Sequence, residues 1–131
     1  MLRVAGIDHV VLRVRDVETM IAFYAGVLGC AVERRREDIG LVQLRAGSSL
    51  IDLIPVDGVL GRQGGAAPGP EGRNLDHLCL RLTDFDAAAV EAHLRAHGVA
   101  VGEIGIRYGA GGDGVSIYLQ DPEGNALELR G

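Results

Sequence analysis

The sequence contains a duplicated segment that begins each half of the chain. Residues 7–16 read IDHVVLRVRD and residues 75–84 read LDHLCLRLTD, so five of the ten positions are identical. Because side chains alternate between the two faces of a strand, each histidine shares a face with the arginine four residues later, His9 with Arg13 and His77 with Arg81. The chain is therefore expected to fold as two related modules whose first strands carry matching polar groups.

The same order of patterns follows each copy. A helix is predicted after an aspartate N-cap, Asp16 or Asp84, and three short strands follow it. In the first half the expected elements are a strand at 7–15, a helix at 17–28 and strands at 31–36, 41–46 and 50–56. In the second half they are a strand at 75–83, a helix at 85–97 and strands at 99–108, 115–120 and 126–130, with residues 109–114 as a hairpin loop. The predicted class is α+β, with two βαβββ modules.

Glycine and proline mark the boundary between the modules. Residues 57–74 are rich in both and cannot bury much apolar area, so this segment is predicted to be a linker. A plain tether and a lid over a site are both compatible with its length. The expected organisation is a first module at 1–56, the linker at 57–74 and a second module at 75–131, which together form one domain.

Composition argues against several classes of function. The formal net charge of −5 disfavours nucleic-acid binding, and all 13 basic residues are Arg, which rules out a Schiff-base lysine. No apolar run approaches the roughly 20 residues that span a bilayer. Cys30 and Cys79 form no CxxC pair and the start of the chain shows no secretory signal, so we expect a cytoplasmic protein that binds a small molecule.

The last strand of each module carries a carboxylate, in addition to the histidine on the first strand of that module. Leu50-Ile51-Asp52-Leu53 aligns with Ala126-Leu127-Glu128-Leu129, and an acid between aliphatic residues is costly to bury without a positive partner. Taken singly, each residue has a simpler reading as a structural histidine or a solvated acid. Their symmetry across the repeat predicts a divalent metal site of His9, Asp52, His77 and Glu128, suited to Zn, Ni, Co, Mn or Fe(II).

Further polar residues are candidates for contact with a substrate or a metal. Arg13 and Arg81 share the parity of the histidines and could hold a substrate carboxylate, or could form internal salt bridges. Tyr118, on the strand before Glu128, could donate to substrate or simply pack. His93 and His97 have helical i,i+4 spacing without an HExxH motif, and are read as a solvated helix face.

These motifs resemble the vicinal oxygen chelate superfamily of glyoxalases, bleomycin-resistance proteins and extradiol dioxygenases. The resemblance is carried by the paired βαβββ modules, by IDHVVLRV and LDHLCLRL, by FYAGVLG at 23–29 and by SIYLQDPEGNALEL at 116–129. It implies a cupped, incomplete barrel of mixed sheets around an ion, with metal ligands matching His9, Asp52, His77 and Glu128. Arg13 matches the position where glyoxalase I places an arginine for the glutathione carboxylate.

The activity that the resemblance implies is a metal-dependent lyase or isomerase of glyoxalase-like type, acting on a small vicinal-oxygen substrate through an enediolate-like intermediate. Glu128 or Asp52 would take the proton, and Arg13, Arg81 and Tyr118 would bind substrate. An Fe(II) extradiol dioxygenase using His9, His77 and Glu128, with Tyr118 at the family's active-site tyrosine, is one alternative. A metal-free binding or drug-resistance protein is another. A homodimer is expected.

Overall fold

The computed structural model describes residues 1–131. The chain divides into two compact units, Met1–Asn74 and Leu75–Gly131, and each unit contains one open four-stranded mixed sheet. This arrangement confirms the predicted α+β class. None of the helices is long and apolar enough to cross a membrane.

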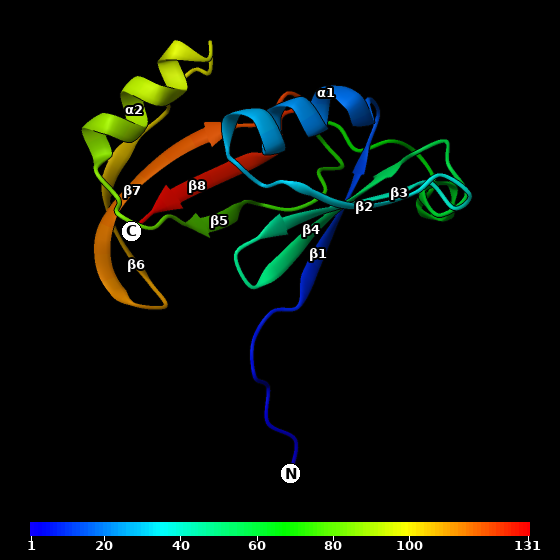
Figure 1. Ribbon diagram of the computed structural model, residues 1–131, viewed down its shortest axis with the longest axis horizontal. Helices are drawn as coiled ribbons and strands as arrows, with labels where there is room; N and C mark the ends of the chain where they lie inside the picture. The colour runs from blue at the N-terminus through cyan, green and yellow to red at the C-terminus, as the bar shows by residue number, and fades with distance from the viewer. The chain divides into compact units, whose positions relative to one another are not determined.

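In the first unit the strand order is β1-β4-β3-β2, with β1 parallel to β4 and the other pairs antiparallel (Figure 1). Its elements are β1 (His9–Val14), α1 (Val17–Ile21), the π-helical segment η1 (Ala22–Val27), β2 (Val32–Arg36), β3 (Leu41–Ala46), β4 (Ser49–Pro55) and the 3-10 turn η2 (Gly61–Gly64). The parallel pairing of the first and last strands brings His9 and Asp52 onto neighbouring strands.

The first unit is helical from Val17 to Val27, close to the predicted 17–28, but it is α-helical only as far as Ile21. Asp16 caps it as expected, since its carboxylate accepts a hydrogen bond from the Thr19 backbone N–H. After Ile21 the coil widens into a π-helix, in which the Leu28 N–H donates to the Phe23 carbonyl five residues earlier. The wider turn accompanies the burial of two successive aromatic residues, Phe23 and Tyr24, whose rings meet edge to face.

The second unit repeats this topology, with strand order β5-β8-β7-β6 and β5 parallel to β8. Its elements are β5 (Leu78–Arg81), α2 (Ala87–Ala96), β6 (Ile104–Gly109), β7 (Gly112–Gln120) and β8 (Ala126–Arg130). The core of each unit lies on the sheet face opposite the candidate acids and contains mainly aliphatic side chains. The fully buried aliphatic strand residues are Leu12, Val14, Leu44, Ile51 and Leu53 in the first unit and Ile117, Leu127 and Leu129 in the second.

Two boundaries in the second unit differ from the prediction. The N-cap of α2 is Asp86 rather than Asp84, because Asp84 adopts a left-handed backbone conformation (φ 50°) that cannot start a helix. Residues 109–114 are not a loop, since β6 continues to Gly109 and β7 begins at Gly112. Only Ala110 and Gly111 remain between the two strands.

The glycine-rich segment 57–74 belongs to the first unit and folds back onto β1. The Arg13 guanidinium donates to the main-chain carbonyls of Gly61, Gly65 and Ala66 at 2.6–3.1 Å. A Cβ at Gly64 would lie 2.3 Å from Nε of Arg13, so the absence of a side chain there makes room for the guanidinium. The segment is therefore packed against its module rather than a plain tether.

Candidate functional site

The two acids predicted from the repeat occupy equivalent positions in the two sheets. Asp52 pairs with Val11 on one side and Gln43 on the other. Glu128 pairs with Cys79 and Tyr118 in the same way. Because these register positions match strand for strand, the structure reproduces the correspondence between Asp52 and Glu128 that the sequence alignment predicts. Both carboxylates are buried, at 4% and 6% exposure.

In the first unit, the strand register places His9 and Asp52 on one face of the sheet. The Gln43 side-chain amide is 3.3 Å from the Asp52 carboxylate, and Nδ1 of His9 is 2.7 Å from the Asp8 carboxylate. That hydrogen bond to Asp8 raises the pKa of His9; burial opposes the rise, and the charge of Asp52 adds to it. The two ligand candidates of this module are thus electrostatically coupled.

In the second unit, His77 and Glu128 are in direct contact. Nε2 of His77 lies 3.2 Å from Oε2 of Glu128, and the other carboxylate oxygen of Glu128 accepts a hydrogen bond from the Ser116 hydroxyl. The Tyr118 ring meets the His77 ring edge-on, with centroids 6.1 Å apart. An imidazole, a carboxylate and two hydroxyls therefore converge within this module.

The environment of Glu128 favours its ionised form. Burial alone would raise the pKa of this carboxyl group, but the Ser116 hydroxyl, the His77 imidazole and the Tyr118 hydroxyl together hold it below its ordinary value. A buried carboxylate that stays ionised is a good ligand for a cation and an available proton acceptor.

Each histidine is oriented by the aspartate that precedes it. Nδ1 of His77 lies 2.7 Å from the Asp76 carboxylate, repeating the geometry of His9 and Asp8. A carboxylate accepts from Nδ1–H and keeps a proton on that nitrogen, which leaves Nε2, the nitrogen that faces Glu128 in His77, as the one that can bind a metal. Metal-binding histidines are commonly held in this manner.

The model of the Glyoxalase/Bleomycin resistance protein/Dioxygenase superfamily matches residues 6–129. The chain belongs to this superfamily. It is 34% identical to the "Glyoxalase domain-containing protein RDO1" of Mycosarcoma maydis over 98% of this chain and 69% of that protein. It is 32% identical to the "Virulence protein STM3117" of Salmonella typhimurium over 94% of this chain and 81% of that protein.

Solved structures of the superfamily share the fold. The crystal structure of the Salmonella typhimurium virulence protein has a TM-score of 0.82 at 26% identity and covers 98% of each chain. A lactoylglutathione lyase from Agrobacterium tumefaciens has a TM-score of 0.70 at 21% identity, covering 96% of this chain and 92% of that one. At that identity the likeness to the lyase concerns the fold alone.

The chemistry of the donor set fits the divalent metal that superfamily members typically use. Each glyoxalase-like module offers one imidazole with an available Nε2 and one buried carboxylate. No group of three or more His, Cys, Asp or Glu side chains is gathered in the structure as a complete metal cluster. The four-residue site thus stays a prediction that combines one observed pair from each module.

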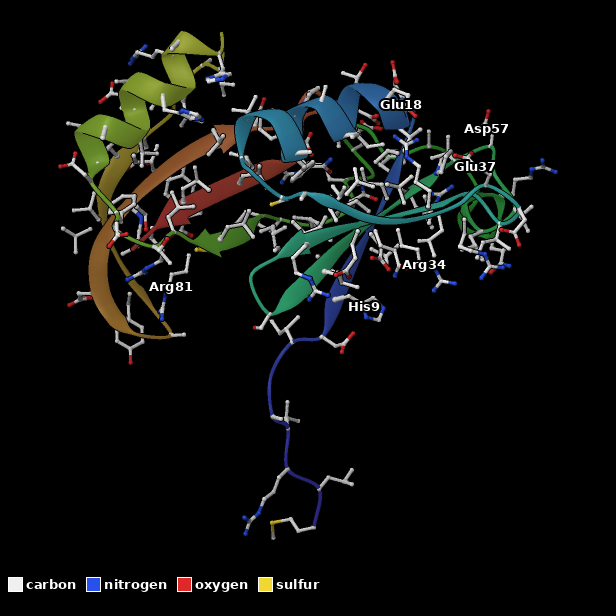
Figure 2. The ribbon with its side chains drawn as sticks, viewed as in Figure 1. His9, Glu18, Arg34, Glu37, Asp57 and Arg81 are labelled. Atoms are coloured by element: carbon white, nitrogen blue, oxygen red, sulfur yellow. The ribbon has the colours of Figure 1, made fainter.

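The predicted substrate-binding residues have different surroundings. Arg13 is occupied by main-chain carbonyls, a contact that favours a structural role, so its contact with substrate stays a prediction. Tyr118 lies beside His77 and is 5.6 Å below the Arg107 guanidinium. Arg81 extends from the end of β5 toward the β6–β7 hairpin (Figure 2) and makes no internal ion pair.

Four polar neighbours of the candidate ligands were not identified from the sequence. Gln43 and Ser116 contact the acids from adjacent strands, and only the strand register could have revealed them. The other two, Asp8 and Asp76, were visible as the duplicated Asp-His pair, whose repetition was the available signal.

Proposed function

We propose that this glyoxalase-superfamily protein is a divalent-metal-dependent lyase or isomerase that acts on a small substrate with adjacent oxygens. The contact between His77 and the ionised Glu128 carries the proposal, because it pairs a metal-binding imidazole with a carboxylate able to accept a proton. His9, Asp52, His77 and Glu128 would hold the ion. A bound divalent ion would polarise the substrate oxygens and stabilise negative charge developing on them.

The residues of the chain supply the remaining chemistry. Glu128 accepts a proton from the carbon next to a carbonyl, and Asp52 is the equivalent acid in the first module. Ser116 donates to Glu128 and fixes the direction of its carboxylate. Because Glu128 is ionised and only 6% exposed, little water competes for the proton acceptor.

Metal content by mass spectrometry on gently purified protein tests this proposal. We expect a near-stoichiometric divalent ion that is lost in His77→Ala and Glu128→Ala and retained in His93→Ala, whose histidine lies on α2. Absence of metal in the parent protein, even after reloading with several divalent ions, would leave a metal-free binding protein of the same fold. Turnover of the hemithioacetal of methylglyoxal and glutathione is the first activity to assay.

An Fe(II) extradiol dioxygenase is the second candidate, and the position of Tyr118 favours it. The tyrosine lies beside both His77 and Glu128, as the resemblance to these dioxygenases requires. Oxygen uptake with catechols after Fe(II) loading, absent in Tyr118→Phe, would support this activity over the lyase.

A cytoplasmic location and a homodimer are also part of the proposal, and sedimentation equilibrium would show the dimer as twice the 13.8 kDa chain mass.

A further inference from the structure

The second unit contains a cavity of about 680 Å³ where β5 and β8 end, beside the β6–β7 hairpin. This volume suits a small molecule rather than a peptide. The polar groups that line it include two guanidiniums, Arg81 and Arg130, and all of its lining residues belong to this unit. The cavity is not one of the features from which the metal site was inferred.

The two arginines are neighbours that no carboxylate contacts directly, although the charge of Arg130 also acts on Glu128. They are register partners across β5 and β8, and neither forms an ion pair within 4.0 Å. Arg130 is only 5% exposed, and its Nη atoms donate to the carbonyls of Arg107 and Gly112 while its Nε has no partner. Arg81 makes no hydrogen bond within the protein. A buried guanidinium normally has a paired carboxylate or a bound anion.

Glycines in the β6–β7 hairpin make the room that these guanidiniums occupy. A Cβ at Gly109 would lie 2.4 Å from Arg130 Nη1, and one at Gly114 would lie 2.8 Å from Arg130 Nη2. A Cβ at Gly111 would likewise lie 2.8 Å from Arg81 Nη2. The glycine-rich sequence of the hairpin therefore has a specific function, which is to admit two positive groups to one end of the sheet.

Three carboxylates also line the cavity, and none forms an ion pair with either arginine. Asp86 is engaged as the N-cap of α2, where it accepts from the Ala89 N–H. Asp84 and Asp113 lie outside ion-pair distance of both guanidiniums. These acids restrict how much negative charge the cavity tolerates, which favours a ligand with a single anionic group over a polyanion.

We propose that this cavity binds the anionic group of a small molecule, a carboxylate or a phosphate, through Arg81 with the Arg130 guanidinium beside it. Arg81 supplies donors that nothing in the protein uses, and a planar guanidinium matches both oxyanions. Arg130 adds positive charge in a position fixed by its contacts with the hairpin. The Gly111 position sets how closely the Arg81 guanidinium approaches the hairpin.

The cavity also defines a substrate class for the proposed reaction. Arg81 and Arg130 each lie two residues beyond Cys79 and Glu128, on the same sheet face, which is about 7 Å along the strands. A substrate with reacting oxygens at Glu128 and a carboxylate or phosphate at its other end would span that distance. This identification rests on the proposed function, whereas anion binding in the cavity does not.

Titration of the metal-free protein with inorganic phosphate and, separately, with acetate tests the proposal. The ¹H–¹⁵N signals of the guanidinium Nε–H groups and of Gly111 and Gly112 report binding. We expect saturable shifts at Arg81 and the hairpin, with affinity lowered about tenfold or more in Arg81→Gln. Arg95→Gln, which alters an α2 arginine paired with Glu91, is the matched control and should bind like the parent.

A second variant tests the position of the charge without removing it. Gly111→Ala keeps both arginines but crowds the flexible end of Arg81, so binding should weaken severalfold while the fold is retained. Non-saturable shifts, or equal affinity in the parent and Arg81→Gln, would overturn the proposal. Metal content of Arg81→Gln separates failure of the anion site from failure of the proposed metal site. A variant that keeps its metal but loses anion binding has lost only the cavity site. A protein that binds the anion but no metal would contradict only the proposed function.

Discussion

At the scale of single residues, the aspartate before each histidine selects the ring nitrogen that can bind a metal. Asp8 and Asp76 both accept from Nδ1 at 2.7 Å, although each carboxylate is largely exposed. The same contact occurs in both copies of the duplicated segment. We therefore expect it to orient the imidazoles rather than to stabilise the fold, because exposed pairs contribute little to stability.

Replacing Asp76 with Asn should shift His77 away from the Nδ1–H tautomer, because an amide is a weaker acceptor than a carboxylate. Divalent-metal affinity should fall about tenfold to a hundredfold. Nitrogen-15 spectra of the metal-free protein measure the tautomer, and calorimetry measures the affinity. Asp57→Asn, on an exposed turn, is the control and should change neither. An unaltered tautomer in Asp76→Asn would contradict this role.

At the scale of elements, two local contacts decide where segments begin and how closely they pack. Asp16 starts α1 by accepting from both the backbone N–H and the hydroxyl of Thr19. Gly61, in η2, lies so close to β4 that a Cβ would be 1.7 Å from the Pro55 carbonyl oxygen. The hydrogen bonds of Asp16 depend on its ionisation and therefore on pH. The close approach at Gly61 depends on the volume of the side chain at that position.

The Asp16 cap predicts a pH-dependent part of stability. The Thr19 N–H, followed by its hydroxyl, lowers the pKa of Asp16 from 3.8. Because the folded pKa is depressed, the stabilisation is fully present above 3.8 and is lost as the pH falls through the lower folded value. Asp16→Ala should therefore lower the urea midpoint at neutral pH, and the difference should narrow in acid. Asp16→Asn keeps a side-chain acceptor, so it should be less destabilised than Asp16→Ala at neutral pH; because Asn does not titrate, its difference from the parent should narrow in acid as well. A constant difference for Asp16→Ala would refute the mechanism.

Gly61→Ala should destabilise the protein by about 3 kcal/mol, because the clash is with rigid backbone rather than with a flexible side chain. Gly26→Ala is the matched control, since nothing lies within 4 Å of its added Cβ. Chemical denaturation of both variants measures the difference. Equal stability of the two would show that the 57–74 segment moves freely from β4.

At the scale of the whole molecule, the duplication places half of the proposed ligand set in each unit. His9 and Asp52 belong to the first unit, and His77 and Glu128 to the second. In the proposed site, one ion would use both sets. The two modules should therefore act together in metal binding although each has its own sheet and core.

A double-mutant cycle on His9→Ala and His77→Ala measures this cooperation. Each single variant should lower metal affinity strongly, and the double variant should lose less than the sum, because one ion uses both imidazoles. Calorimetry gives the affinities and the stoichiometry. Two independent ions, with additive losses, would instead assign a separate site to each module.

Part of this organisation follows from local sequence patterns. The α+β class, the βαβββ order and the equivalence of Asp52 and Glu128 could be predicted, because strand alternation and turn residues are local properties and the repeat supplies an internal comparison. The repeat placed His77 and Glu128 in one candidate set, but their direct contact depends on the parallel pairing of β5 with β8.

The tertiary structure alone decided the features that depend on contacts between distant segments. Ser116 and Gln43 reach the acids through strand register, and Arg13 is directed to carbonyls some fifty residues away. Gly109, Gly111 and Gly114 of the hairpin leave room for guanidiniums that would otherwise meet their Cβ atoms. Such contacts are selected by packing over the whole unit rather than by local preference. The sequence by itself therefore determined which groups each module carries, and the fold determined which neighbours tune them.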